Sequence, residues 1–96
     1  MTQFQAKEDE LYIDGQKVIG VWESFSGCYW FATKEIERGV FDLGNEEVEG
    51  ITYHGLVQGL EEEWGDFCTA EFKEMIHKHQ MWEVPRENWT ISGRRN

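Results

Sequence analysis

The chain is short of basic residues, and this shortage limits the partners it can bind. Nine Lys and Arg stand against nineteen Asp and Glu, which gives a formal net charge of −10 at pH 7. Nucleic-acid backbones and anionic membrane surfaces attract Lys and Arg, so the composition argues against both as direct partners. A basic protein surface is the natural complement, although acidity also serves simply to keep a small domain soluble.

Cysteine is also scarce. The chain has two, Cys28 and Cys68, and they match no Cys-x-x-Cys spacing of a metal or redox site. We interpret them as two small, at least partly buried thiols, with a single disulfide or a reactive thiol as the alternatives. A chain of this length buries roughly 60–70% of its unfolded surface, so it needs no disulfide to be stable.

Long apolar runs are missing as well. No stretch reaches the roughly 18–20 apolar residues that a membrane-spanning helix needs, and the N-terminal residues lack the apolar core of a secretion signal. The sequence therefore predicts a cytoplasmic protein.

Aromatic residues, by contrast, are abundant. Five Trp, three Tyr and six Phe occur in 96 residues, and each can bury roughly 150–250 Å². Acidic chains with few aromatic residues remain disordered, so this one is expected to fold. Its length favours a single domain over residues 1–96, with frayed ends at 1–8 and 92–96.

Local patterns predict a mostly antiparallel sheet. The pattern predicts a β-hairpin over residues 10–23, with its turn at Asp14-Gly15, and a third strand over residues 28–33. Residues 34–50 read as a long acidic connection with at most a short strand at 39–43. A strand at 51–58, a second hairpin ending near residue 67 and an edge strand at 81–84, stopped by Pro85, complete the sheet.

One helix is predicted from Ala70 to about Gln80, with Thr69 as its N-cap. An apolar stripe at helical spacing should pack on the sheet; it consists of Phe72, Met75, Ile76 and His79. The expected fold class is therefore α+β, with an antiparallel sheet of about five strands and one amphipathic helix packed on it.

Residues 55–72 resemble a pattern found in short uncharacterised proteins of plasmids, phages and archaeal mobile elements. In that pattern a strand ends in a Gly-rich turn, and a Glu-x-Gly-aromatic step and a short helix follow. The stretch that carries the resemblance here runs from Gly55 to Phe72 and includes Glu63-Trp64-Gly65-Asp66-Phe67. The resemblance implies a small α+β domain of mobile-element origin and carries no catalytic residues.

Signatures of catalysis and of cofactor binding are absent from the sequence. No phosphate-binding loop, nucleophile elbow or paired metal-binding motif occurs, and the Glu74 to His77 step is a single copy of a motif that di-iron bundles use twice. We therefore expect no enzyme activity, no cofactor and no metal. The alternative kept open is a small hydrolase that uses His54 or a thiol, or carboxylates beside Trp64.

The acidic residues are concentrated in one part of the chain. Residues 35–74 hold twelve acids and two bases, which accounts for the whole net charge. Two groups flank the strand predicted at 51–58, and about 3.3 Å per residue would place them roughly 25 Å apart. The predicted partner-binding residues are Glu46, Glu47, Glu49, Glu61, Glu62, Glu63, Trp64 and Asp66.

The sequence thus favours a non-catalytic acidic binding protein from a phage or mobile element. Its expected partner is the basic surface of a host protein that itself binds nucleic acid, and its action would be that of a nucleic-acid-mimicking inhibitor of an anti-restriction or anti-CRISPR type. Two other interpretations stay open. The acids can form an ordinary solvated face, or the chain can be a self-associating structural protein that uses an apolar stripe or an open sheet edge.

Overall fold

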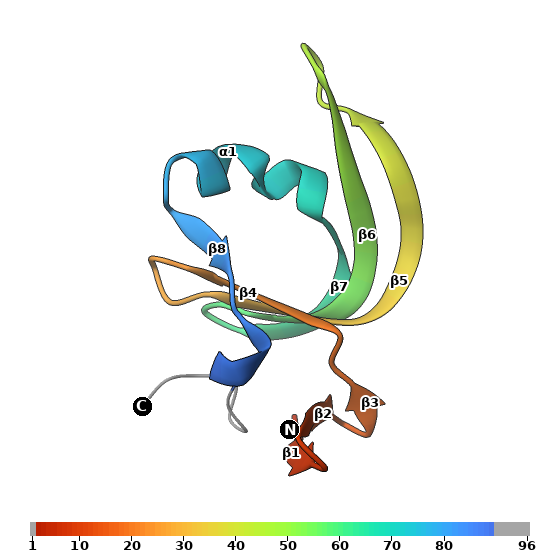
Figure 1. The fold of residues 1–96 in the computed structure, drawn as a ribbon, viewed down its shortest axis with the longest axis vertical. Coiled ribbons are helices and arrows are strands. Elements are labelled where there is room, and N and C mark those ends of the chain that lie inside the picture. Colours follow the sequence, from red (N-terminus) through yellow and green to blue (C-terminus); the bar gives the residue numbers. More distant parts are fainter. Residues whose placement is uncertain (1, 90–96) are drawn as a thin grey trace.

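The computed structural model describes residues 2–89 and shows two antiparallel sheets and a short helical segment (Figure 1). The chain is broadly α+β, but it carries a second sheet that the sequence did not predict. The elements in chain order are β1 (Phe4–Lys7), β2 (Glu10–Ile13), β3 (Gln16–Lys17), β4 (Gly20–Ser24), β5 (Tyr29–Asp42), β6 (Glu47–Gln58), β7 (Glu62–Cys68), η1 (Thr69–Phe72), α1 (Lys73–His77), β8 (Met81–Glu83) and η2 (Arg86–Asn88).

The N-terminal sheet has the order β1-β2-β3. Asp14 and Gly15 have φ of 51° and 81°, so the predicted turn between β2 and β3 is a tight one with both central residues left-handed. The predicted hairpin over 10–23 is divided, however, because β4 leaves β2 and joins the larger sheet. The segment expected to be frayed, 1–8, contains β1, which pairs along β2 from Phe4 to Lys7.

The larger sheet has the order β7-β6-β5-β4-β8 and is strongly curved (Figure 1). Its longest strands are β5 and β6, whose pairing shifts register between Ala32 and Lys34 and again between Glu35 and Glu37. Such bulges bend a strand and increase its twist. The connection predicted over 34–50 is therefore wrong, since most of these residues extend the two strands and only 43–46 form the turn.

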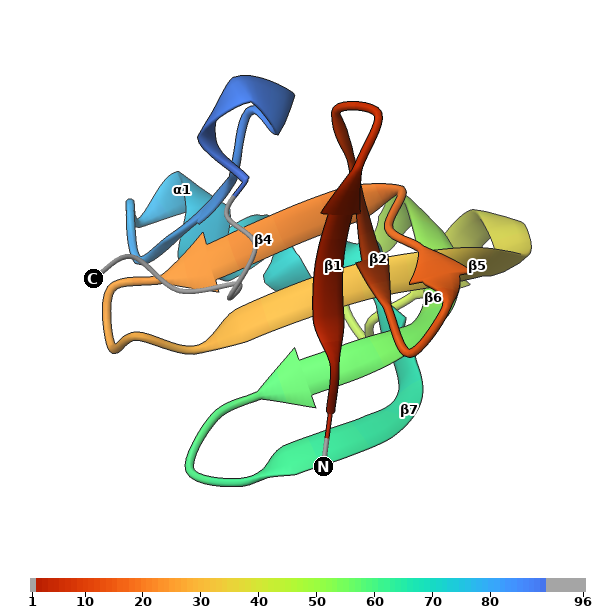
Figure 2. The same cartoon turned by 90° about the horizontal axis from the view of Figure 1, so that it is seen from below.

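Two apolar cores lie on the two faces of the curved sheet. The outer core lies under the N-terminal sheet, whose strands cross the larger one (Figure 2). The inner core lies inside the curve, where η1 and α1 cover the sheet (Figure 1). The outer core consists of Leu11, Ile13, Val18, Val21, Tyr29, Phe31 and Leu56, and the inner core of Trp22, Ala32, Phe67, Phe72 and Met81.

Aromatic rings account for much of the inner core. The Trp22 ring centroid lies 5.5 Å from that of Tyr53, 6.0 Å from Phe67 and 5.9 Å from Phe72. Phe72 also contacts Trp30, with ring centroids 5.4 Å apart. The tilted and edge-on geometries of these pairs are those that aromatic quadrupoles favour.

The predicted helix over 70–80 begins at the expected place but ends at His77. Its predicted cap is wrong, because the Thr69 hydroxyl accepts a hydrogen bond from the Ile51 backbone N–H across to β6 instead. Of the predicted stripe, Phe72 and Met75 pack on the inner core, whereas Ile76 is 43% exposed and His79 lies beyond the helix end.

The C-terminal part of the described chain returns to the sheet. β8 pairs with β4, as predicted for an edge strand, and Pro85 follows shortly after it. Trp89 then donates from its indole N–H to the Val84 carbonyl at 3.0 Å and packs on the outer core. The end predicted to be frayed, 92–96, lies outside the described residues.

Candidate functional site

The first predicted acidic group lies on a projecting two-stranded ribbon. β4 pairs with β5 only as far as Ala32, and β7 pairs with β6 only from Thr52 onward. Residues 34–51, which we call the arm, therefore extend beyond the neighbouring strands (Figure 1). The arm carries three of the predicted residues, Glu46, Glu47 and Glu49, all with exposed side chains.

The second predicted group lies at the other end of β6, where the chain turns into β7. Glu61, Glu62, Glu63 and Asp66 are all exposed there. β6 has twelve residues instead of the predicted eight, and Glu47 at its start is about 36 Å along the strand from Gln58, which pairs with Glu62. Asp66 pairs with His54, so it lies nearer, at about 17 Å along the strand from Glu49. The structure thus places the predicted acids at two ends of a curved element, not on one compact face.

The acids differ in whether their carboxylates already have a polar partner within the chain. Lys73 Nζ lies 3.2 Å from Glu46 Oε1, and His54 Nδ1 lies 2.9 Å from Asp66 Oδ1. Glu62 accepts hydrogen bonds from the Thr2 hydroxyl at 2.6 Å and the Gln58 amide at 2.7 Å. Within residues 2–89 no ion pair involves the remaining four, Glu47, Glu49, Glu61 and Glu63.

Other acids on and near the arm have close basic partners. Arg38 donates to both carboxylate oxygens of Glu35, at 3.2 and 2.8 Å, and these hydrogen bonds lower the pKa of Glu35. Lys78 Nζ lies 3.0 Å from Glu74 Oε1, and its hydrogen bond lowers the pKa of that carboxyl. These bases are therefore already engaged within the chain.

Trp64 does not project from the surface. Its side chain packs against the outer core and stacks on the His54 ring, with centroids 5.9 Å apart. Asp66, the partner of His54, is 60% exposed, and His54 itself is 38% exposed. The three side chains are therefore in contact, with Asp66 the most exposed of them.

The features named for a hydrolase are only partly brought together. His54 contacts the Asp66 carboxylate and the Trp64 ring. Cys28 and Cys68 are free thiols, which excludes the single disulfide. Among the residues that the structure describes, no group of three or more His, Cys, Asp or Glu is arranged to hold a metal ion.

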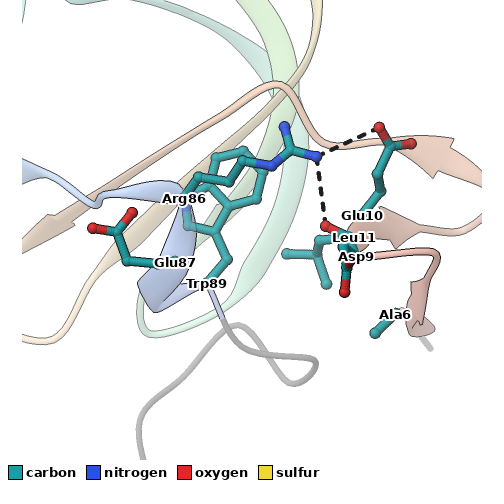
Figure 3. Close-up of a pocket in the computed structure, with 7 residues that line it drawn as sticks. All are labelled: Ala6, Asp9, Glu10, Leu11, Arg86, Glu87 and Trp89. Carbon is teal, nitrogen blue, oxygen red and sulfur yellow. Dashed lines mark hydrogen bonds and ion pairs between the residues drawn. The ribbon is translucent and has the colours of Figure 1, made fainter.

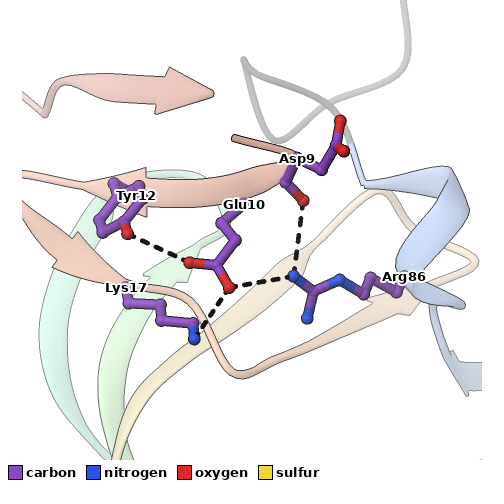
Figure 4. Close-up of polar contacts among 5 residues, drawn as sticks. All are labelled: Asp9, Glu10, Tyr12, Lys17 and Arg86. Carbon is purple, nitrogen blue, oxygen red and sulfur yellow. Dashed lines mark hydrogen bonds and ion pairs between the residues drawn. The ribbon is translucent and has the colours of Figure 1, made fainter. Parts of the chain in front are cut away.

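A polar cluster that sequence reasoning missed joins the N-terminal hairpin to η2. Glu10 is its centre, accepting from Lys17 Nζ at 2.9 Å, the Tyr12 hydroxyl at 3.1 Å and Arg86 at 3.4 Å (Figure 4). The hydrogen bond from Lys17 is the main cause that lowers the pKa of Glu10, and the bond to Glu10 raises the pKa of Tyr12. Residues 10 and 86 are 76 positions apart, and no local pattern indicates their contact.

A hollow of about 480 Å³ lies beside this cluster (Figure 3). The Arg86 guanidinium lies 5.5 Å from the centroid of the Trp89 ring and also donates to the Asp9 carbonyl at 3.5 Å. Arg86 thus already contacts Glu10 and Trp89, and the Glu10 carboxylate partly offsets its charge within the chain. The lining residues are Ala6, Asp9, Glu10, Leu11, Arg86, Glu87 and Trp89.

A second hollow, of about 410 Å³, lies at the base of the arm and is lined by Arg38, Gly39, Val40, Glu49, Gly50, Ile51 and Thr69. A third, of about 630 Å³, opens between the arm's turn and α1. The Lys73–Glu46 ion pair crosses this third hollow, and Ile76 and His77 line it. This solvent-exposed pair links the arm's turn to α1, in addition to the hydrogen bond from the Ile51 N–H to the Thr69 hydroxyl at the arm's base.

No family model, curated protein or solved structure matches the chain. Within the described part, none of the helices is both long and apolar enough to cross a membrane.

Proposed function

We propose that the chain is a non-catalytic binding protein whose acidic surface occupies a basic site on another protein. One observation carries this proposal: four acids are exposed and form no ion pair among the described residues. They are Glu47, Glu49, Glu61 and Glu63. Their charge is available to a partner's Lys and Arg, and complementary charges accelerate encounter and set specificity.

The concrete form of the proposal is a nucleic-acid mimic of phage or mobile-element origin that inhibits a host defence protein. Glu47 and Glu49 are two residues apart on β6, which corresponds to about 6.6 Å on one strand face. That spacing is close to twice the roughly 3.4 Å axial rise per charge of one DNA strand. The arm is also narrow enough, as a two-stranded ribbon, to enter a channel that holds nucleic acid.

Charge reversal at these acids tests the proposal. A Glu47→Lys/Glu49→Lys/Glu61→Lys variant should lose at least tenfold in retention of a basic protein from a lysate of the source organism. The matched control, Glu8→Lys/Glu83→Lys/Glu87→Lys, changes the net charge equally at exposed acids outside residues 35–74 and should retain the partner. Retention should fall as salt rises. Equal retention by both variants, or elution that does not depend on salt, contradicts the proposal.

Self-association is a second candidate, favoured by exposed apolar side chains on the arm. Ile36, Val40 and Leu43 are 49%, 62% and 41% exposed. Apolar patches of this kind mark interaction sites. Light scattering at low and high salt separates the candidates: a homo-oligomer that persists at both would favour self-association, and a monomer would favour the acidic binding protein.

A further inference from the structure

One side of β7 pairs with no other strand among the described residues, and this side indicates how a partner could bind. β7 is the terminal strand of the larger sheet, with β6 on one side and no strand on the other among the described residues (Figure 2). Its seven residues span about 23 Å, and alternate residues direct their N–H and C=O groups away from β6. An edge of this kind is a template for a further strand.

This edge lacks most of the devices that normally block strand addition. Proteins commonly protect edges with charged side chains, especially Lys, or with Pro or a β-bulge. Of these devices β7 carries acidic side chains, which repel another acidic strand but attract a basic one. Residues 55–72 contain no Lys, Arg or Pro, and β7 pairs with β6 from Glu62 to Cys68 without any register shift. The β5–β6 pair, by contrast, shifts register twice, so the bulges lie away from this edge.

The negative charge of this edge favours a basic strand over a second copy of the chain. Pairing with β7 of a second copy would place the acids of one strand beside those of the other, and like charges opposite each other destabilise a sheet. A strand that carries Lys or Arg would instead be attracted, because Glu61, Glu63 and Asp66 are exposed along this edge. The occupant that the edge fits is therefore a basic extended segment of another protein.

The two faces of β7 offer different contacts to such a strand. On one face Trp64 lies between Glu62 and Asp66, so it provides a half-buried aromatic surface flanked by acids. On the other face Gly65 lies between Glu63 and Phe67, and nothing lies within 4 Å of the position that a Cβ would take there. That space admits the aliphatic part of a Lys or Arg whose charge reaches Glu63.

We infer that β7 binds a basic extended segment of the partner as an added sixth strand of the larger sheet. This inference rests on the proposed function and specifies how the partner is held at one of the two acidic groups. Main-chain hydrogen bonds provide affinity in this mode, and the alternating side chains provide specificity.

A synthetic seven-residue peptide of alternating Lys and Val, capped at both ends, tests the inference with the full chain. Its titration should shift the amide resonances of β7 and slow hydrogen exchange at alternate amides of this strand. A peptide of the same sequence with N-methyl groups on alternate residues keeps the charge but loses the donors on one edge, and it should bind at least tenfold more weakly. Equal binding of the two peptides overturns the inference.

Substitutions at Gly65 provide the matched variants. The open space there accommodates a side chain, so Gly65→Lys and Gly65→Gln should both fold. Gly65→Lys should weaken binding of the unmethylated peptide at least tenfold, because it fills the open space and adds a repelling charge. Gly65→Gln only fills the space, so it should weaken binding by about threefold. If the resonance shifts centre instead on Glu47 and Glu49 of the arm, the edge is not the site, yet the acidic binding function stands. If charge reversal also leaves partner retention unchanged, both fail.

Discussion

Gly55 lies where two neighbouring strands approach each other unusually closely. A Cβ at this position would lie 1.8 Å from the Phe31 carbonyl oxygen and 3.0 Å from the Ala32 Cα, so a backbone would have to move. Gly55 pairs with Ala32, immediately before the first register shift of β5. The absence of a side chain here allows the strands to bend around the inner core.

Gly55→Ala should therefore destabilise the protein by about 3 kcal/mol, because the added methyl group overpacks against backbone. Gly39→Ala is the control, since nothing lies within 4 Å of its Cβ position. That substitution should be neutral or stabilise by up to about 1 kcal/mol through the unfolded state. Urea unfolding of the two variants measures the difference, and equal stabilities would contradict the account of Gly55.

The lowered pKa of Glu10 predicts that the stability of the protein depends on pH in the acid range. Its pKa is lowered in the folded chain, chiefly by the hydrogen bond from Lys17 and further by those from Tyr12 and Arg86. The folded state therefore holds this proton less tightly than the unfolded state does. The stabilising contribution is fully present above the unfolded pKa of Glu, about 4.3, and is lost as the pH falls through the lower folded pKa.

Glu10→Gln should accordingly be less stable than the wild type at neutral pH and equal to it well below the folded pKa. Unfolding free energies measured from neutral pH into the acid range check this. Glu87→Gln is the control, because Glu87 is exposed and forms no ion pair within the described residues. A difference between Glu10→Gln and wild type that stays constant with pH would show that the carboxylate charge is not what matters.

Single residues also show where sequence reasoning succeeds and where it stops. The left-handed pair Asp14-Gly15 was predictable because Asp and Gly favour that conformation. Glu8 and Asp9 adopt it too, with φ of 53° and 65°, and connect β1 to β2. A Glu-Asp pair gives no turn signal, so the strand before it was taken for a frayed end.

At the scale of elements, the end of α1 is a Schellman motif without glycine. Gln80 N–H donates to the Met75 carbonyl at 2.8 Å, and His79 N–H donates to Ile76 at 3.0 Å. The residue between helix and strand, His79, has φ of 59°. Glycine is usual at this position, and its absence is why the sequence predicted three more helical residues.

His79→Gly should stabilise the protein by about 1 kcal/mol, because a left-handed conformation costs a residue with a Cβ roughly that much. For a chain of this size the expected rise in Tm is roughly 4–8 °C. The matched control is His77→Gly, within α1, which should lower stability by about 1 kcal/mol. Thermal unfolding of both variants is the measurement, and shifts of the same sign would contradict the assignment.

The arm was the element that the sequence could not predict. Its strands are exposed on both faces from Lys34 to Val40, so they lack the alternation of apolar and polar residues that identifies a strand. Their conformation depends on pairing between β5 and β6, which is a tertiary effect. Strands with a buried face, such as those near residues 29–32 and 51–58, were predicted because the alternation or the aromatic content was visible.

At the scale of the whole molecule, most of the net charge of −10 lies in two places, the arm and the region of β7. That the predicted acids lie outside the cores follows from their chemistry and could be expected from the sequence. Their separation along a twelve-residue strand could not, because it depends on how far β6 extends into the arm. The Glu10 cluster could not be predicted from the sequence either, because Glu10 and Arg86 are far apart in the chain and only the fold brings them together.

The central claim is that the acidic surface occupies the nucleic-acid site of a basic partner. Its most direct test is competition, with a fluorescein-labelled DNA duplex bound to the protein retained in the charge-reversal experiment and the wild-type chain added in increasing amounts. The account predicts that the anisotropy falls to that of free DNA, while Glu47→Lys/Glu49→Lys/Glu61→Lys leaves it unchanged at the same concentrations. Undiminished anisotropy at saturating wild-type chain, with both bound to the partner at once, would contradict it.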